Sequence, residues 1–160
     1  MNVKADVPSA GSGTAVDLAR LESYLAAAPR VVAATVFGSA RNGWVQPGSD
    51  LDVAVLFDRP PAADEFLRFY ADLCDQLPGV EKVDLVVLNQ ADPILAFEAL
   101  RGRFLCKNDP EQVAAFFSLV CREYEDVMAT VADQQHRRGH PDQGAGAGNR
   151  SAGSARSATG

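Results

Sequence analysis

The chain has 160 residues, 47% of them hydrophobic, and a formal net charge of −6. This length and composition suit one domain with a real core, and no run of 18 apolar residues is present that would span a membrane. Its three cysteines have no CxxC spacing, which argues against a disulfide framework or a zinc site and favours a reducing compartment. The acidic balance argues against direct nucleic-acid binding, which needs a basic face.

The two ends of the chain differ from its middle in composition. Residues 1–13 are polar and contain Gly and Ser but no apolar secretory stretch, so we expect a loose arm and a cytoplasmic protein. From residue 133 onward the chain is rich in Gly, Ala, Ser and Arg and has almost no large apolar residue. Such a segment cannot bury enough surface to fold alone. We therefore expect an arm over 1–13, a folded domain over 14–132 and a disordered tail over 133–160.

Hydrophobic periodicity and turn signals divide the middle of the chain into alternating helices and strands. A weak capping box at Thr14–Asp17 predicts a first helix that runs to about Ala28. Apolar runs predict strands, and Pro and Gly pairs predict the breaks between elements. The further expected elements are strands at 31–37, 51–57, 82–88 and 104–107, and helices at 64–77, 92–101 and 109–132. This order predicts an α/β (α+β) fold with a small mixed sheet, packed helices and a long C-terminal helix.

The most informative segment joins the first two long strands and reads GSARNGWVQPGSDLDVAVLF. Asp50 and Asp52 are two residues apart at the start of the second strand, so both side chains point to the same face. Mg²⁺ prefers oxygen ligands, usually one or two carboxylates with substrate phosphates and water, and a pair of such acids can share two metal ions. The alternative is that Asp50 caps the strand and Asp52 faces solvent.

Asp84 is a third candidate acid, because it lies inside the apolar strand KVDLVVL. An unpaired carboxylate is costly to bury in such a strand, and a position beside the other two acids would explain it. Asp84 would then bind a second metal ion and orient or deprotonate an attacking hydroxyl. The alternative is an edge position, with Asp84 paired to Lys82 or Arg103.

Gly38 and Ser39 directly follow the first strand and form a candidate phosphate-binding turn. Glycine allows close approach of the backbone, and the N–H groups of a turn that opens a short helix bind anions. Arg41 and Ser49 could add contacts to phosphate, although a solvated arginine and a turn serine are equally reasonable. Metal-binding acids next to such a turn predict nucleotidyl transfer.

The pattern GSx₁₀DxD with a third acid in a later strand resembles the DNA polymerase beta-like nucleotidyltransferase superfamily. The short chain is similar within it to the minimal nucleotidyltransferases, specifically the MntA-type antitoxins of HEPN/MNT toxin–antitoxin systems. GSARNG, SDLDVAVLF and KVDLVVLN carry the resemblance. The family commonly has a second basic residue in the Gly-Ser turn, where this chain has Arg41 alone.

The resemblance implies a Mg²⁺-dependent protein adenylyltransferase, with two metal ions held by Asp50, Asp52 and Asp84 and with ATP as substrate. Such antitoxins transfer AMP to a tyrosine of a HEPN RNase toxin and so neutralise it. Neither histidine of this chain has an arginine four to six residues upstream, as a HEPN RNase would, so the toxin would be a separate protein. Two alternatives are a small-molecule nucleotidyltransferase of the aminoglycoside-modifying kind and an antitoxin that acts by binding alone.

Overall fold

The computed structural model describes residues 13–139, and the expected arm and tail lie largely outside this range. Contacts within the chain divide it into a compact unit that ends at Val127 and a second unit that begins at Met128. Helices and strands alternate as the sequence predicts. The helices are α1 (Leu18–Ala27), α2 (Ala63–Asp75), α3 (Pro93–Leu100) and α4 (Pro110–Gly139), and the strands are β1 (Thr14–Ala15), β2 (Val31–Phe37), β3 (Trp44–Val45), β4 (Leu51–Phe57), β5 (Val83–Val87) and β6 (Arg103–Lys107).

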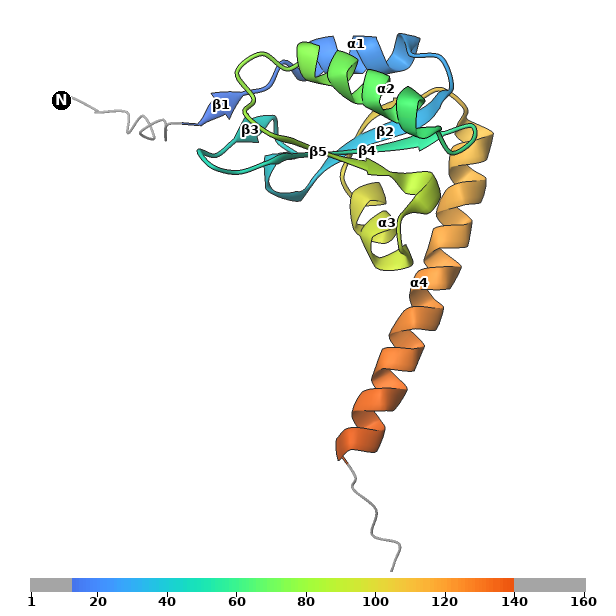
Figure 1. Cartoon of the computed structure of the whole chain (residues 1–160). Coiled ribbons are helices and arrows are strands. Elements are labelled where there is room, and N and C mark those ends of the chain that lie inside the picture. The colour runs from blue at the N-terminus through green and yellow to red at the C-terminus, as the bar shows by residue number, and fades with distance from the viewer. Residues whose placement is uncertain (1–12, 140–160) are drawn as a thin grey trace, which may run out of the picture. The chain divides into compact units, whose positions relative to one another are not determined.

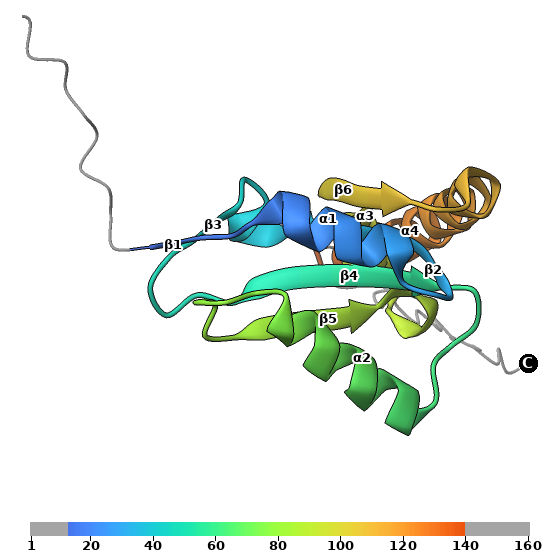
Figure 2. The same cartoon turned by 90° about the horizontal axis from the view of Figure 1, so that it is seen from above.

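The first unit is built on a mixed four-stranded sheet with the order β5-β4-β2-β6. Strands β4 and β5 are parallel, whereas β2 pairs antiparallel with both β4 and β6. Helices α1 and α2 cover one face of the sheet and α3 lies on the opposite face (Figure 1). The view from above shows α1 across the middle of the sheet and α2 along the β5 side (Figure 2). A small second sheet pairs β1 with β3.

Strand β2 is buried along its whole length because helices cover both faces of the sheet. One apolar cluster joins this sheet to α1 and α2 through residues such as Leu21, Leu25 and Leu73. The other cluster joins it to α3 and the first turns of α4. Thr35 is fully buried in β2, and its hydroxyl donates a hydrogen bond of 2.9 Å to the Ala99 carbonyl of α3. That bond fixes the end of α3 against the strand.

The predicted strands at 31–37 and 51–57 coincide with β2 and β4, and the predictions for β5, β6 and α3 differ from the structure by at most one residue at either end. The first helix starts later than predicted. Thr14 lies in β1 instead, because its backbone pairs with Val45 of β3. The cap is supplied by Asp17, whose carboxylate accepts a hydrogen bond from the backbone N–H of Arg20 at 2.9 Å.

Residues 133–139, which we expected in the disordered tail, are helical and belong to α4. A helix that is already nucleated extends at low cost, because each further residue adds one hydrogen bond. The ion pair of Arg137 with Asp133, one turn apart at 3.0 Å, also favours the helix here. None of the helices described over residues 13–139 is long and apolar enough to cross a membrane.

Candidate active site

The three candidate acids lie at the same end of two neighbouring strands. Asp52 of β4 is directly beside Asp84 of β5 in the parallel register, and Asp50 immediately precedes β4. Side chains at paired positions of a parallel ladder point to the same face, so Asp52 and Asp84 share the sheet face that α3 covers farther along. Asp84 is exposed and the other two acids are half-buried. The sequence-predicted acids are therefore brought together around this end of β4.

Gly38 lies against Asp52, which connects the candidate phosphate turn to the acids. The antiparallel register of β2 and β4 pairs Phe37 with Asp52, so the turn that follows Phe37 begins beside this carboxylate. Gly38 has a φ of +69°, and a Cβ atom at this position would collide with Oδ2 of Asp52. Only glycine combines this left-handed backbone with such a close approach. Residues 38–40 then form a single 3₁₀ turn, with Ser39 exposed.

The shared location of the acids changes the electrostatics of Asp52. Partial burial raises the pKa of its carboxyl group above the usual value, and the negative charges of Asp84 and Asp50 raise it further. Like charges held this close repel each other, so the cluster favours a cation that offsets them. Repulsion of this kind is a common feature of functional sites.

Lys82 forms an ion pair with Asp50, with 2.9 Å between Nζ and Oδ2. The alternative for Asp84, pairing with Lys82 or Arg103, does not occur among the described residues, since Arg103 pairs with Glu22 at 3.1 Å. The hydrogen bond and the charge of Asp50 together raise the pKa of Lys82. Lys82 therefore offsets part of the negative charge at the site, a role that no motif in the sequence indicates.

A hollow of about 170 Å³ includes Gly38 in its lining, and two arginines line it as well. Arg41 comes from the Gly-Ser turn and Arg101 from the end of α3. The remaining lining residues are Phe37, Gly38, Glu98 and Gly102. The turn at residues 38–42 has Arg41 as its single basic residue, and Arg101 brings another guanidinium to the same hollow from 60 positions farther along the chain.

Gly102 explains how α3 brings Arg101 so close to β2. A Cβ atom at Gly102 would collide with the carbonyl oxygen of Val36 and would lie 2.8 Å from Cβ of Phe37. No local motif points to Arg101 or Gly102 in the sequence. Ser49 directly precedes Asp50 and lines a separate hollow of about 120 Å³ with Thr14, Gly48 and Glu81.

The donor set at the acids fits a hard divalent cation. Asp50, Asp52 and Asp84 offer carboxylate oxygens, which Mg²⁺ prefers. Within residues 13–139, no three acidic, cysteine or histidine side chains converge tightly enough to enclose a metal ion by themselves. Mg²⁺ sites usually include only one or two carboxylates and complete their shell with substrate phosphates and water, so this arrangement fits an ion that arrives with a nucleotide.

Residues 19–111 match the family described as Polymerase beta, Nucleotidyltransferase. This match spans more than half of the chain and includes the Gly-Ser turn and all three acids. The chain therefore belongs to this nucleotidyltransferase family. A comparison with curated proteins found no match.

Several solved structures share the fold of this chain. A chain from a mutant of the toxin–antitoxin MntA-HpeT is 21% identical, with a TM-score of 0.58 and coverage of 77% of this chain and 95% of that chain. A toxin–antitoxin structure with AMP-PNP gives 20% identity, a TM-score of 0.58 and coverage of 78% and 99%. A structure of tri-AMPylated Shewanella oneidensis HEPN toxin in complex with MNT antitoxin gives 19% identity, a TM-score of 0.57 and coverage of 77% and 99%.

Proposed function

We propose that this protein is an antitoxin that transfers AMP from ATP to a tyrosine of a partner HEPN toxin and thereby neutralises it. The observation that carries the proposal is the pairing of Asp52 with Asp84 beside Gly38, in a chain that belongs to the nucleotidyltransferase family. Structures of toxin–antitoxin complexes with the same fold, one with AMP-PNP and one with an AMPylated HEPN toxin, support this choice of reaction and partner.

In this proposal Asp50, Asp52 and Asp84 hold Mg²⁺ together with the triphosphate of ATP. Bound Mg²⁺ supplies positive charge that polarises the phosphates and offsets the charge that develops during transfer. The backbone of Gly38 and Ser39 lies close enough to the acids to contact the same triphosphate. Arg41 and Arg101 bring two guanidinium groups to the adjoining hollow, where Glu98 lies 4.0 Å from Arg101 and offsets part of their charge. Ser49 would contribute at most a peripheral contact.

The reaction is an in-line displacement at the α-phosphorus of ATP. The tyrosine oxygen forms a bond to this phosphorus while the bond to the bridging oxygen of pyrophosphate breaks, and pyrophosphate leaves. Asp84 is the exposed acid of the group, so it is best placed to accept the phenolic proton as a general base. Asp52, which is half-buried against Gly38, would serve only as a ligand of the cation.

The test is transfer of label from α-³²P-ATP, with Mg²⁺, to the proposed HEPN toxin partner. We expect labelled toxin, loss of its RNase activity, and a rate lowered at least about 100-fold by Asp50→Asn or Asp52→Asn, because charge stabilisation by the metal is worth several kcal/mol. Glu111→Gln, a change to an acid on α4, is a matched control and should leave the rate unchanged.

Two results would favour the alternatives. Labelling of an aminoglycoside and not of the toxin would indicate a small-molecule nucleotidyltransferase. Protection of cells by a variant in which all three acids are alanine would indicate that binding alone suffices.

A further inference from the structure

The outer edge of β5 connects the candidate active site to an apolar pocket. Strand β5 is the last strand of the four-stranded sheet and, in the part of the chain that the structure describes, pairs only with β4. Asp84 lies near its start and Val87 at its end. These two residues are about 10 Å apart, at roughly 3.3 Å per residue of strand. A substrate segment along this edge would therefore contact both places.

The edge offers backbone groups for a further strand. The backbone N–H of Leu51 donates to the carbonyl of Lys82 at 3.0 Å. In a parallel ladder, successive residues of a strand direct their backbone groups alternately toward the neighbouring strand and away from it. The backbone groups that point toward β4 are therefore those of Asp84 and Val86, and the groups that point outward are those of Val83, Leu85 and Val87. The Val83 carbonyl accepts a hydrogen bond from the Tyr70 hydroxyl at 3.0 Å. The Val87 carbonyl accepts the first hydrogen bond of the 3₁₀ turn at Leu88–Gln90. Both outward groups of Leu85 and the N–H of Val87 remain for another strand.

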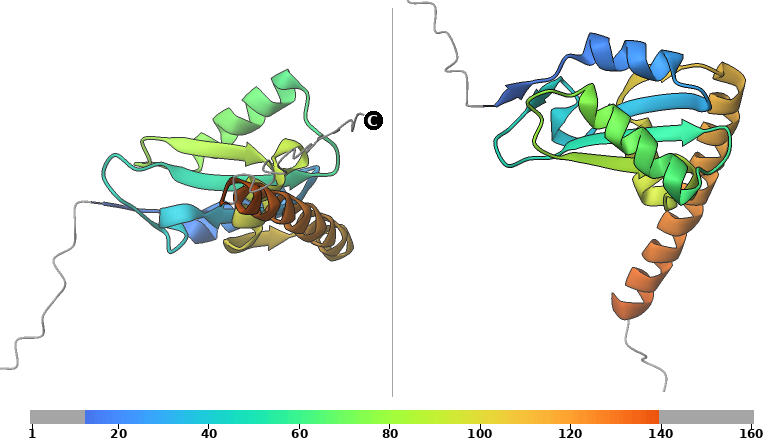
Figure 3. Two further views of the ribbon diagram at one scale, coloured as in Figure 1. Left: turned by 90° about the horizontal axis from the view of Figure 1, so that it is seen from below. Right: turned by 45° about the horizontal axis from the view of Figure 1, so that its top comes forward.

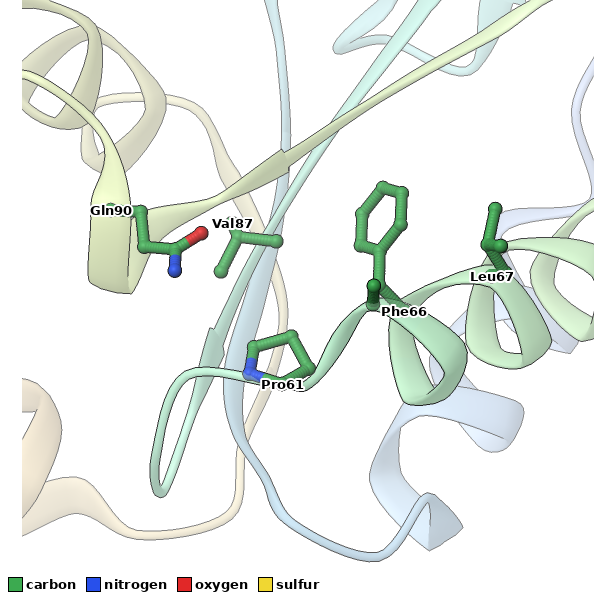
Figure 4. A pocket seen from close by; sticks show the side chains of 6 residues that line it. Pro61, Phe66, Leu67, Val87 and Gln90 are labelled. Carbon is green, nitrogen blue, oxygen red and sulfur yellow. The ribbon is translucent and has the colours of Figure 1, made fainter.

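The pocket, which we call the edge pocket, has a volume of about 520 Å³ and lies where α2 overhangs the end of β5. It is lined by Pro61, Ala63, Phe66, Leu67, Val87 and Gln90. Figure 4 shows Pro61, Phe66 and Leu67 on one side and Val87 and Gln90 on the other. Both views in Figure 3 show α2 on the β5 side of the sheet. Leu67 is 63% exposed, the highest value for any large apolar side chain in residues 13–139.

Asp84 and the edge pocket lie on opposite faces of the sheet. Val87 packs in the same cluster as α1 and α2, whereas Asp84 shares a face with Asp52. Residues three apart in an extended strand also point to opposite faces. A strand paired with β5 could therefore present one side chain to Asp84 and another, three positions away, to the edge pocket.

We propose that the acceptor is bound as an extended segment that adds a strand to the β5 edge, with its tyrosine beside Asp84 and an apolar side chain three residues away in the edge pocket. This inference rests on the proposed function and names the form in which the acceptor is recognised. Backbone pairing would supply affinity and the pocket would supply specificity, as in other cases of strand addition. The exposed acids Glu81 and Asp84 at the start of the edge favour basic residues in that segment.

The first experiment compares two exposed leucines in the intact protein with its toxin partner. Leu67→Gln removes apolar surface from the edge pocket, whereas Leu119→Gln, at a residue of α4 that is 42% exposed, is the matched control. We expect Leu67→Gln to raise the KM for the toxin roughly tenfold, because the burial of one leucine side chain strengthens binding by about this factor. The KM for ATP and the slow release of AMP to water should stay unchanged, which separates this role from a general loss of structure.

The second experiment uses nine-residue peptides of Ala, Gln and Lys with a central tyrosine and one leucine at each other position in turn. We expect the fastest AMP transfer with leucine three positions from tyrosine, on one side only, and no such preference with Leu67→Gln. Methylation of the peptide backbone nitrogens should slow transfer at every second position, because alternate N–H groups would bond to β5.

Three results would overturn the strand addition: an unchanged KM for the toxin in Leu67→Gln, equal transfer to all leucine positions, or equal effects of N-methylation at neighbouring positions. The strand addition would also be overturned if no peptide is modified and if Leu67→Gln and Leu119→Gln modify the toxin at equal rates. By contrast, the absence of AMP transfer to any acceptor would contradict the proposed function itself.

Discussion

Lys82 and Asp50 form the contact at the candidate site that a nucleotide with its metal ion would have to change. The ion pair is 2.9 Å long, and the Lys82 side chain is 70% exposed. Exposed ion pairs of this kind contribute little to stability, so a divalent cation can replace the lysine at Asp50 at low cost. Lys82 then acts as a competitor that keeps Asp50 neutralised while no cation is bound.

Removal of this competitor should lower the Mg²⁺ concentration that gives half-maximal activity. We expect Lys82→Met to lower it by up to about fivefold, a small effect because an exposed lysine competes only weakly with a divalent cation. Lys107→Met is the control, because it makes the same change in net charge at a residue that lies over the Phe104 ring. A Mg²⁺ titration of AMP transfer measures both variants. A higher Mg²⁺ requirement in Lys82→Met would indicate that the lysine binds the phosphates instead.

Asp52 should make the free protein less stable at neutral pH. Its pKa is raised in the folded state by burial and by its two acidic neighbours, so the folded state favours the protonated form. The stability that this group contributes is therefore present below its unfolded pKa of about 3.9 and is lost as the pH rises through the higher folded value.

Asp52→Asn keeps the shape of the side chain and removes the charge, so it should stabilise the free protein at pH 7 and abolish transfer. The gain should shrink as the pH is lowered toward 4. Urea unfolding at several pH values measures it, with Asp75→Asn, an exposed acid of α2, as the control. A variant at residue 52 that is no more stable than the wild-type protein at pH 7 would contradict the argument.

At the scale of elements, the position of α3 determines where Arg101 lies. The helix is tied to β2 by the buried hydrogen bond from Thr35 to the Ala99 carbonyl and by the close approach of Gly102 to Val36. Both contacts lie next to the hollow that Arg101 and Gly38 line. A weaker contact between α3 and β2 should therefore affect phosphate binding as well as stability.

Thr35→Val tests this coupling, because it keeps the shape of the side chain and removes the hydroxyl that ties β2 to the Ala99 carbonyl, which keeps the backbone N–H of Gly102 as a donor at 3.1 Å. We expect a loss of about 0.5–1.5 kcal/mol in the free energy of unfolding, the net value of one hydrogen bond, and a weaker apparent affinity for ATP at temperatures where the protein is still folded. Thr35→Ser retains the hydroxyl and should keep the ATP affinity close to that of the wild-type protein. Equal affinity for ATP in both variants would show that the position of α3 does not depend on this bond.

The same contacts show which parts of the structure could be predicted from the sequence. The strands β2 and β4 and the acids at their ends follow from local patterns, since apolar runs and turn residues lie next to each other in the chain. The approach of Arg101 to Gly38 and the pairing of Lys82 with Asp50 depend on which strands are neighbours, and no local pattern records this. The helical residues 133–139 were missed because composition alone does not show that a helix has already formed before them.

At the scale of the whole molecule, the acidic cluster links ligand binding to stability. A ligand that binds only the folded state adds RT ln(1 + [L]/Kd) to the free energy of unfolding, which is about 2.7 kcal/mol at a concentration 100 times Kd. Because the acids require a cation and the cation requires phosphates to complete its shell, Mg²⁺ and a nucleotide should stabilise the protein together far more than either does alone. A non-hydrolysable ATP analogue with Mg²⁺ should therefore raise the Tm by several degrees, measured by calorimetry. The rise should disappear in Asp52→Asn, although the free form of that variant melts at a higher temperature than the wild-type protein. An equal rise in both proteins would place the nucleotide away from the acids.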